Sequence, residues 1–289
     1  MGEIKFGTDG WRGIISDDFT FDNVRRLGAA IADYYTAKAK KIFRKGAKIK
    51  IAVGYDARFL SADYARTISE VLASRGITAI LSDRAIPTPA LSFAVRHKKL
   101  AAGVMVTASH NPPIYNGIKI KTHSGGAAGI EVTSEIEKLL PRVPGHQGIG
   151  ASGKIKKVDF SKDYVNFLRT YIDYKRLKNS RFRVLVDAMH GSGNGFIADV
   201  LKGAKIRLDF IRNQINPSFG GLRPEPVLEN LKPTINKLKE KPYDLGLVLD
   251  GDADRITAFA GRGELIYPQK ILLAVQAPCT CLAWCGSQR

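Results

Sequence analysis

Short apolar runs of strand length alternate along this chain with longer segments whose apolar residues follow helical spacing, and this alternation limits the folds open to it. The predicted strands of the first half lie at residues 49–53, 77–81 and 100–106; the predicted helices lie at about 21–41 and 61–74, with one more ending near 97 after Pro87-Thr-Pro89. This alternation of strands and helices favours a mainly parallel α/β layer. Ser61 is a suitable N-cap for the helix that begins there.

A glycine-rich stretch at residues 144–153 is typical of a linker, and a second α/β unit follows it. We expect strands of that unit at 183–187, 206–211 and 245–249, with helices at about 162–174 and ending near 239. The turn at 190–195 lacks both the Gly-Lys-Ser/Thr ending of a P-loop and the last glycine of a dinucleotide fingerprint. It therefore predicts a tight strand-to-helix connection, with contact near the cleft as a secondary possibility.

The apolar run 100–106 is followed directly by Thr107-Ala-Ser-His-Asn-Pro-Pro113. In open α/β sheets, ligands bind at the carboxyl ends of the strands. Two consecutive prolines prevent a helix from starting at once. We therefore expect Ser109 to lie on an irregular loop with its hydroxyl available; an ordinary strand-to-loop turn is the alternative.

Three carboxylates at alternate positions, Asp250, Asp252 and Asp254, follow the apolar run 245–249. A calcium loop is excluded, because its sixth position requires glycine and its twelfth glutamate, whereas these positions hold Arg255 and Gly261. Mg²⁺ prefers oxygen ligands and often completes its shell with a phosphate, and a guanidinium is well shaped to bind that phosphate. We predict a magnesium site with a phosphate beside Arg255; a solvated acidic loop is the alternative.

Four motifs occur in order and at sensible separations: Phe6-Gly-Thr-Asp-Gly-Trp-Arg-Gly13, Thr107-Ala-Ser-His-Asn-Pro112, Asn116-Gly-Ile-Lys119 and Asp250-Gly-Asp-Ala-Asp-Arg255. Together they resemble the α-D-phosphohexomutase family, which includes phosphoglucomutase and phosphomannomutase, from about residue 4 to about residue 276. The resemblance implies an α/β fold of repeated three-layer domains with mainly parallel, mixed sheets. We expect residues 1–145 to form the domain with the phosphoserine loop, 155–255 the domain with the metal loop, and 256–289 the incomplete start of a third domain with an atypical tail.

The resemblance also implies roles for single residues, and Ser109, Lys119, His110 and Arg12 are the catalytic candidates. Lys119 would lie close to Ser109 as a proton-transfer group, and Thr8 and Arg12 would contact phosphate in the cleft. His110 is a poor base for Ser109, because adjacent residues on an extended segment point apart; we expect it to shape the loop or contact phosphate. For Asp56 and Arg58 we expect a structural ion pair.

The family reaction is the reversible conversion of a hexose 1-phosphate to its 6-phosphate. By this resemblance, Ser109 is phosphorylated at rest, passes its phosphoryl group to the free sugar hydroxyl and takes the other phosphate back. Mg²⁺ on Asp250, Asp252 and Asp254 would also bind a phosphoserine oxygen on Ser109, with Arg255 and Arg12 as further donors. Glucose 1,6-bisphosphate would be the activator. Such residues suit phosphoryl transfer, which depends mostly on positioning and electrostatic stabilisation.

The formal charge of +18 comes in part from seven Lys and Arg between residues 38 and 50, where no acid occurs. A solvated helix end and loop explain that run, so we expect a phosphosugar partner, no specific nucleic acid and at most weak polyanion binding. No stretch approaches the roughly 20 apolar residues of a membrane span, and the N-terminus has no apolar signal segment. We therefore expect no membrane partner and a cytoplasmic location. Neither the oligomeric state nor a choice between glucose and mannose can be predicted.

Residues 277–289 differ in character from the rest and contain all three cysteines, Cys279, Cys281 and Cys285. Their spacing does not suit a structural zinc site. We expect a frameshift or a sequence boundary here, or else a native apolar tail. A competing function follows: a truncated, inactive paralogue or fragment that lacks the sugar- and phosphate-binding domains. A phosphoserine phosphatase-like hydrolase and a basic binding module also compete with the mutase interpretation.

Overall fold

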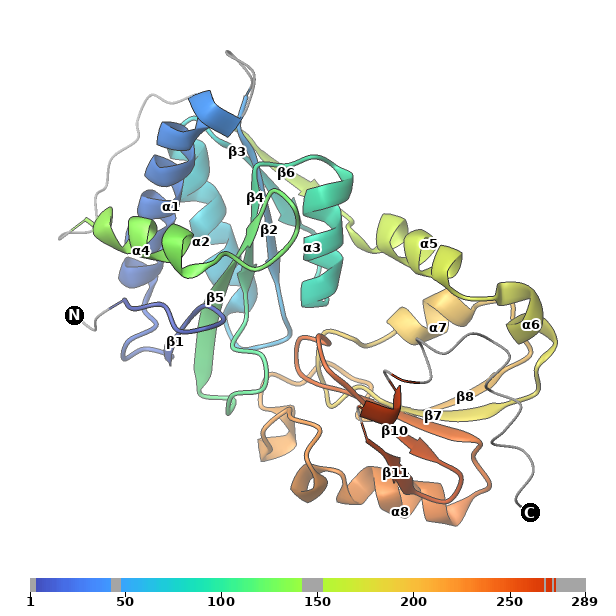
Figure 1. Cartoon of the computed structure of the whole chain (residues 1–289). Helices are drawn as coiled ribbons and strands as arrows, with labels where there is room; N and C mark the ends of the chain where they lie inside the picture. Colours follow the sequence, from blue (N-terminus) through green and yellow to red (C-terminus); the bar gives the residue numbers. More distant parts are fainter. Residues whose placement is uncertain (1–3, 43–47, 142–152, 268, 272, 274–289) are drawn as a thin grey trace.

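The computed structural model describes residues 4–42, 48–141, 153–267, 269–271 and 273. In that part of the chain two α/β units follow one another, each built on its own sheet (Figure 1). The predicted fold class, three-layer α/β units with mainly parallel, mixed sheets, is confirmed. No helix among the described residues is long and apolar enough to cross a bilayer.

Six strands form the first sheet, in the order β1-β5-β4-β2-β3-β6. They are β1 (Trp11–Ile14), β2 (Lys50–Tyr55), β3 (Thr78–Ser82), β4 (Ala102–Val106), β5 (Tyr115–Thr122) and β6 (Ile155–Val158). Strands β4, β2, β3 and β6 run parallel, whereas β5 is antiparallel to β4 and β1 is antiparallel to β5. The carboxyl ends of the parallel strands therefore share one edge, where the Ser109 loop begins.

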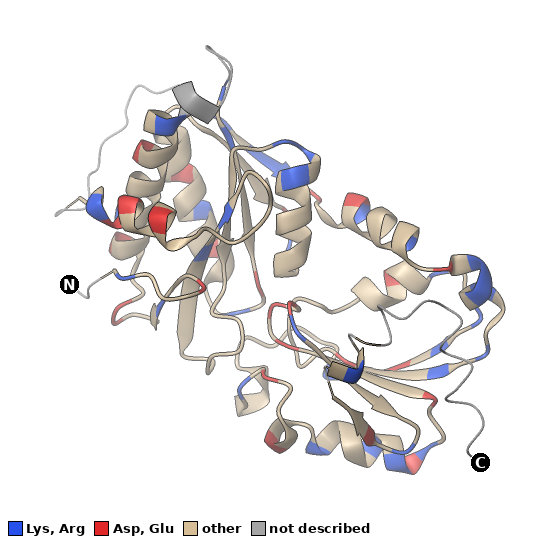
Figure 2. Ribbon diagram, in the orientation of Figure 1, with Lys and Arg blue, Asp and Glu red and all other residues tan. Residues whose placement is uncertain are grey.

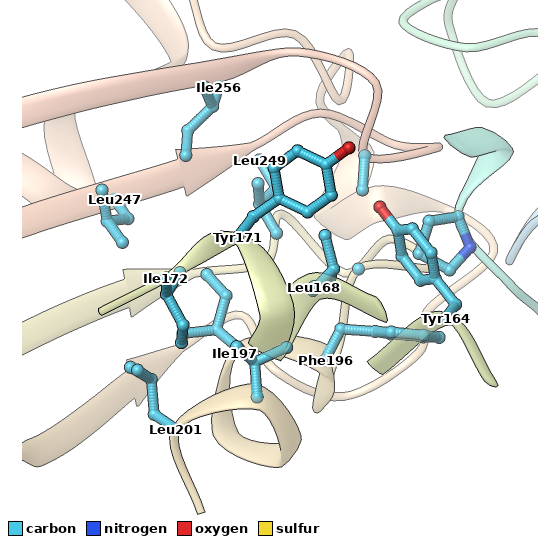
Figure 3. Close-up of a pocket in the computed structure, with 14 residues that line it drawn as sticks. Tyr164, Leu168, Tyr171, Ile172, Phe196, Ile197, Leu201, Leu247, Leu249 and Ile256 are labelled. Atoms are coloured by element: carbon cyan, nitrogen blue, oxygen red, sulfur yellow. The ribbon is translucent and has the colours of Figure 1, made fainter. Parts of the chain in front are cut away.

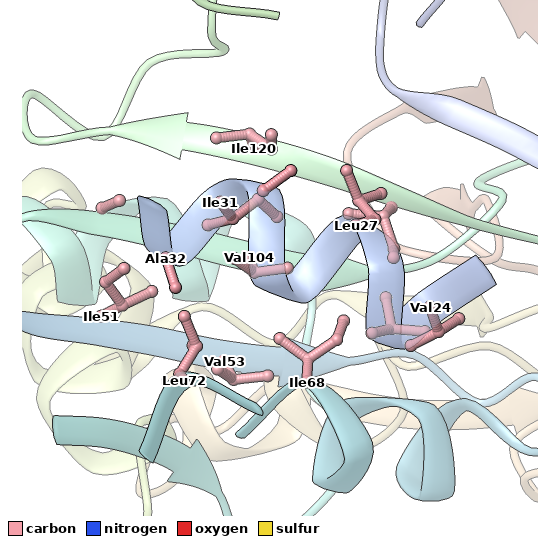
Figure 4. Close-up of a cluster of buried hydrophobic side chains, with 14 of the residues drawn as sticks. Val24, Leu27, Ile31, Ala32, Ile51, Val53, Ile68, Leu72, Val104 and Ile120 are labelled. Carbon is pink, nitrogen blue, oxygen red and sulfur yellow. The ribbon is translucent and has the colours of Figure 1, made fainter. Parts of the chain in front are cut away.

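Helices cover both faces of this sheet, since successive strand residues point to opposite sides. Helices α1 (Phe21–Ile42), α2 (Ser61–Ser74) and α4 (Ile130–Lys138) lie on one face, and α3 (Thr88–His97) lies on the other (Figure 1). Ile51 and Val53 of β2 belong to the core with α1 and α2, whereas Ala52 between them belongs to the core with α3. Figure 4 shows the larger of these cores, in which side chains of α1 and α2 meet those of β2, β4 and β5.

Five strands form the second sheet, in the order β11-β10-β9-β7-β8. They are β7 (Arg183–Asp187), β8 (Arg207–Ile211), β9 (Leu245–Leu249), β10 (Ile256–Ala260) and β11 (Glu264–Ile266). The helices of this unit are α5 (Ser161–Tyr171), α6 (Tyr174–Asn179), α7 (Phe196–Leu201) and α8 (Lys232–Glu240), with 3₁₀ turns η1 (Phe219–Gly221) and η2 (Leu228–Asn230). Strands β8, β7 and β9 run parallel, and α8 buries Leu238 with Val248 and Phe259 on one face of the sheet.

The other face of the second sheet bears an apolar hollow of about 440 Å³ between α5, α7 and the strands β9 and β10 (Figure 3). Tyr164 and Leu168 of α5 line it opposite Leu247 and Leu249 of β9. No charged side chain belongs to its described lining. This hollow therefore does not suit a phosphorylated ligand.

Three expectations from the sequence need correction. Strand β6, which we assigned to the second domain, pairs with β3 of the first sheet. Residues 256–260, expected to open a third unit, form β10, which pairs with β9 and extends the second sheet. The helix expected at about 162–174 is α5, which ends at Tyr171, and a further helix, α6, begins at Tyr174.

Ser61 is not the N-cap of α2, because Leu60 holds that position with a φ of 59°. The hydroxyl of Ser61 donates instead to Asp56 Oδ1, over 2.8 Å. Most of the glycine-rich linker and all three cysteines lie outside the described residues.

The core of the first unit offers a matched stability test on two helical isoleucines, Ile31 at 0% exposure and Ile130 at 81%. We expect Ile31→Ala to lower the free energy of unfolding by about 2–5 kcal/mol, because it removes buried methyl groups and leaves a cavity. Ile130→Ala should change it by less than about 0.5 kcal/mol. Urea unfolding of both variants measures the difference, and equal effects would contradict the packing described above.

Candidate active site

Ser109 lies three residues beyond the end of β4, on the irregular loop that the sequence predicts. Its backbone is left-handed, with a φ of 54°. The Ser109 N–H donates to Thr107 Oγ1 over 2.8 Å, and the Thr107 hydroxyl donates to Asp56 Oδ2 over 2.6 Å. The residue as a whole is 1% exposed, because a loop of the second unit covers it. The hydroxyl thus faces a junction between the two units and not open solvent.

The side chain of Arg58 binds the backbone of the serine loop. Its side chain is fully buried, and its Nε lies 3.3 Å from Asp56 Oδ2, as an ion pair without hydrogen-bond geometry. Nη2 donates to the carbonyls of Ser109 (2.8 Å) and Asn111 (2.6 Å), and Nη1 donates to those of Pro112 (2.8 Å) and Tyr115 (2.9 Å). The predicted ion pair of Asp56 and Arg58 is confirmed, but its role in ordering the catalytic loop was not predicted.

The loop with the three aspartates connects β9 to β10 and reaches the serine loop directly. A Cβ built on Gly251 would lie 2.7 Å from the Ser109 carbonyl oxygen, so this close approach requires glycine. Behind the loop, the N–H and hydroxyl of Ser192 donate to the Gly251 carbonyl over 3.0 and 3.2 Å. The turn at 190–195 therefore supports the aspartate loop.

The carboxylates of Asp250, Asp252 and Asp254 offer oxygens that all lie within 4.8 Å of one another. The Ser109 hydroxyl donates to Asp250 Oδ2 over 3.4 Å. Asp252 Oδ1 is buried and has no hydrogen-bond partner among the described residues. Burial, together with the charges of the other two aspartates, raises the pKa of Asp250 to about 8. Such a crowded, incompletely satisfied oxygen set fits a hard divalent cation.

Lys119 enters this cluster from β5. Its Nζ lies 2.9 Å from Asp9, 3.0 Å from Asp252 and 2.8 Å from Asp254. Burial alone would lower the pKa of Lys119, but the carboxylates of Asp252 and Asp254 outweigh burial and raise it. Lys119 is therefore protonated at neutral pH and contributes a positive charge among these carboxylates.

Thr88 also meets the aspartate loop, at the start of α3. Its N–H donates to the Asp252 carbonyl over 2.9 Å, and its hydroxyl donates to Asp252 Oδ2 over 2.6 Å. The amino end of a helix favours a negative charge. Burial acts to raise the pKa of Asp252, but Lys119 and Thr88 outweigh burial and lower it. Neither Thr88 nor Asp9 was among the predicted site residues.

Arg12 and Thr8 border the same junction. Arg12 Nη1 donates to Asn111 Oδ1 over 2.6 Å, which ties the first motif to the serine loop. Both residues line a hollow of about 390 Å³, together with Asp9 and Lys5. Thr8 is exposed and Arg12 is half-buried, so both side chains are accessible to a ligand in that hollow.

His110 and Arg255 gather around Glu225, a residue that no sequence pattern singled out. Arg255 Nη1 lies 3.2 Å from Glu225 Oε1, and His110 Nε2 lies 3.9 Å from the same oxygen. Burial and the nearby Arg255 lower the pKa of His110, so its imidazole is neutral at neutral pH. Arg255 contacts the aspartates through its backbone: its N–H donates to Asp250 Oδ1 over 3.1 Å, and its carbonyl accepts from the Asp250 N–H over 3.4 Å.

The buried Arg58 generates a stability prediction. Arg58→Met should lower the free energy of unfolding by about 3–5 kcal/mol, because it leaves the buried Asp56 without its ionic partner. Arg66→Met is the matched control on the exposed side of α2 and should cost less than about 0.5 kcal/mol. Chemical denaturation measures both, and a loss as small for Arg58 as for Arg66 would refute its role.

Comparison with known proteins places this geometry in a family. The family model described as phosphoglucomutase/phosphomannomutase, alpha/beta/alpha domain I, matches residues 3–144, and the model for domain II matches residues 162–263. The second match includes β10 and thus agrees with the sheet pairing.

The curated relatives above 30% identity include two from different organisms. A phosphoglucosamine/phosphogalactosamine mutase of Sulfurisphaera tokodaii is 32% identical over 268 residues, which cover 92% of this chain and 56% of that protein. A phosphoglucomutase of Neisseria meningitidis serogroup B is 31% identical, over 91% of this chain and 54% of that protein. The chain thus spans about half the length of these relatives.

Solved structures agree with the curated relatives. The crystal structure of a candidate phosphomannomutase from Thermus thermophilus superposes with a TM-score of 0.85 at 34% identity, over 100% of this chain and 63% of that one. Two successive family models and relatives above 30% identity lead to one conclusion: the chain belongs to the phosphoglucomutase/phosphomannomutase family.

Proposed function

We propose that this chain carries the phosphoryl-transfer site of a phosphohexomutase, which interconverts hexose 1-phosphates and hexose 6-phosphates through a phosphoserine at Ser109. The observation that carries the proposal is the 3.4 Å contact between Ser109 Oγ and Asp250 Oδ2. It joins a serine held by the first unit to three carboxylates held by the second. That pairing of a phosphate carrier with a cation-binding set is what phosphoryl transfer requires.

In the forward half-reaction, the bond between phosphorus and Ser109 Oγ breaks while a bond forms between phosphorus and the sugar hydroxyl oxygen. The sugar hydroxyl loses its proton, and Ser109 Oγ gains one, so the charges balance. The proton that Ser109 Oγ gains replaces the one that the sugar hydroxyl loses, and the hydroxyl so formed donates to Asp250 Oδ2. The second half-reaction reverses these changes at the other phosphate of the sugar.

Asp250, Asp252 and Asp254 are the residues that would hold Mg²⁺, together with a phosphoserine oxygen on Ser109. Bound there, the ion would offset the negative charge that otherwise repels an incoming oxygen. Lys119 adds a fixed positive charge beside the same carboxylates, and it stabilises the transferring phosphoryl group as a donor.

The substrate's phosphate would be bound by the cationic and polar groups around the junction. Arg12 and Thr8 line the adjacent hollow, and Arg255 and His110 lie close to Glu225. Glucose 1,6-bisphosphate is the expected activator, because it can phosphorylate Ser109 and leave a hexose monophosphate. Relatives named for glucosamine, glucose and mannose phosphates match at 32%, 31% and 29% identity, so the sugar is not part of the proposal. A cytoplasmic location stays a prediction.

Phosphorylation of the serine is the direct test. After incubation with glucose 1,6-bisphosphate and Mg²⁺, intact-mass analysis should find one phosphoryl group, and peptide mapping should place it on Ser109. Ser109→Ala should carry none, whereas Ser124→Ala, which changes an exposed serine of the same unit, should be phosphorylated like the parent chain.

A transfer assay then distinguishes a mutase from a phosphatase and from an inactive chain. The phosphorylated chain should return its phosphoryl group to added glucose 1-phosphate. Release of inorganic phosphate in place of that transfer would favour a phosphatase. A chain that takes up no phosphate under any of these conditions would be inactive.

Metal binding gives a second prediction. Mg²⁺ at about 100 times its dissociation constant should stabilise the chain by about 2.7 kcal/mol, because the ion binds only the folded site. Thermal unfolding with and without MgCl₂ measures this gain. Asp252→Asn should lose most of it, whereas Asp17→Asn, an exposed aspartate of the first unit, should keep it. A gain that survives in Asp252→Asn would place the ion elsewhere.

A further inference from the structure

A second concentration of charge lies at the amino ends of β7 and β8, the edge of the second sheet opposite to the aspartate loop. Four basic side chains line a hollow of about 460 Å³ there: Arg181, Arg183, Lys205 and Arg207. Figure 2 shows more basic residues on α6 beside these strand ends. The proposed mutase chemistry uses none of them.

The sheet register brings two of these arginines face to face. Arg183 and Arg207 are partners in the parallel pairing of β7 and β8, so both side chains leave the sheet on one face. Like charges directly opposite each other destabilise a sheet. Asp209 offsets only one of them: it lies 2.8 Å from Arg183 Nη2 and also accepts from the Tyr243 hydroxyl over 2.8 Å.

The other three cations have no such carboxylate partner among the described residues. Within the part of the chain that the structure describes, no carboxylate lies within ion-pair distance of Arg181, Lys205 or Arg207. The backbone nevertheless fixes their positions. The Lys205 N–H donates to the Lys178 carbonyl over 3.0 Å, and the Arg207 N–H donates to the Phe182 carbonyl over 2.8 Å. These hydrogen bonds fix the backbone of the two segments that lead into β7 and β8, and that backbone positions the side chains that line the hollow.

We propose that this basic hollow binds a small anion with at least two phosphate groups. Guanidinium groups present paired donors that match phosphate oxygens, and three of the four cations are arginines. A phosphate monoester carries about 1.5 to 2 negative charges at neutral pH, so two such groups match the uncompensated cations. The hollow also falls within the range of roughly 300–1,000 Å³ that small-molecule sites occupy.

A nucleic-acid backbone is the less favoured occupant. Single strands are usually bound along a basic groove with aromatic side chains on which successive bases stack. These four cations converge on one hollow. On the two connections that form it, described residues 178–183 and 202–207, the one aromatic side chain is Phe182, at 49% exposure.

The basic hollow is separate from the candidate active site. Strand β7 starts at the hollow with Arg183 and ends with Asp187, and its neighbour β9 leads into the aspartate loop. Five residues at about 3.3 Å each place the two edges roughly 15 Å apart. Binding at the hollow should therefore need neither Mg²⁺ nor Ser109, and it can be tested whether or not the mutase proposal holds.

Calorimetric titration of the whole chain with inorganic tripolyphosphate, in a buffer without divalent metal, is the test. The double variant Arg181→Gln with Arg207→Gln should bind at least about tenfold more weakly, because it loses two charge-assisted sets of hydrogen bonds. Arg183 is left unchanged because it forms an ion pair with Asp209. The matched control, Arg66→Gln with Arg96→Gln, removes two exposed arginines of the first unit and should bind within about twofold of the parent chain.

Three results would overturn the proposal. Equal weakening in both double variants would mean that net charge alone attracts the anion. Loss of binding in Arg12→Gln with retention in the Arg181/Arg207 variant would place the anion at the active site. Tighter binding of a single-stranded oligonucleotide that tripolyphosphate cannot displace would identify the surface as a nucleic-acid site.

Discussion

Three carboxylates crowded at one point, two of them buried, are the constraint to which the rest of the described structure is adapted. Asp250, Asp252 and Asp254 repel one another, and burial adds to the cost of charge on Asp250 and Asp252. The fold offsets that cost from several directions. Lys119 arrives from β5, Thr88 from the start of α3, and backbone N–H groups of the loop itself donate to Asp250. Because two of these three come from the first unit, the aspartate loop is completed only where the two units meet.

That meeting also fixes the serine. Arg58 binds four carbonyls of its loop, and Phe219 of the second unit lies over the Arg58 guanidinium at 5.0 Å. Gly251 approaches the Ser109 carbonyl closely enough to exclude any side chain. The backbone of Ser109 is thus held by contacts from both units, and its hydroxyl is directed at Asp250. Phosphoryl transfer depends on such positioning, since a misplaced reacting atom loses much of the rate.

The local parts of this structure could be predicted from the sequence, and the contacts between parts could not. Residues 183–187 form the expected strand because apolar, β-branched residues specify it locally. Lys119 lies on a strand face that the alternation would assign to solvent, yet it is 2% exposed, and Asp252 and Asp254 of the aspartate loop lie against its ammonium group. The boundary at residue 256 was wrong because hydrogen-bond register between β9 and β10 leaves no mark in composition. Asp9, Thr88 and Glu225 were missed for the same reason: each acts on a partner distant in sequence.

The second sheet has the aspartate cluster at one edge and the basic hollow at the other. Acids follow the carboxyl end of β9, and bases precede β7 and β8. A sheet has only a small dipole of its own, so the sorting comes from the side chains. At the acidic edge, a phosphate can approach only when a cation offsets the aspartates. At the basic edge, the positive charges belong to the protein's own side chains, so a phosphate can bind there without a metal ion. Removing divalent metal should therefore weaken phosphate binding at the first edge and leave it intact at the second, which makes the two sites separable in one protein.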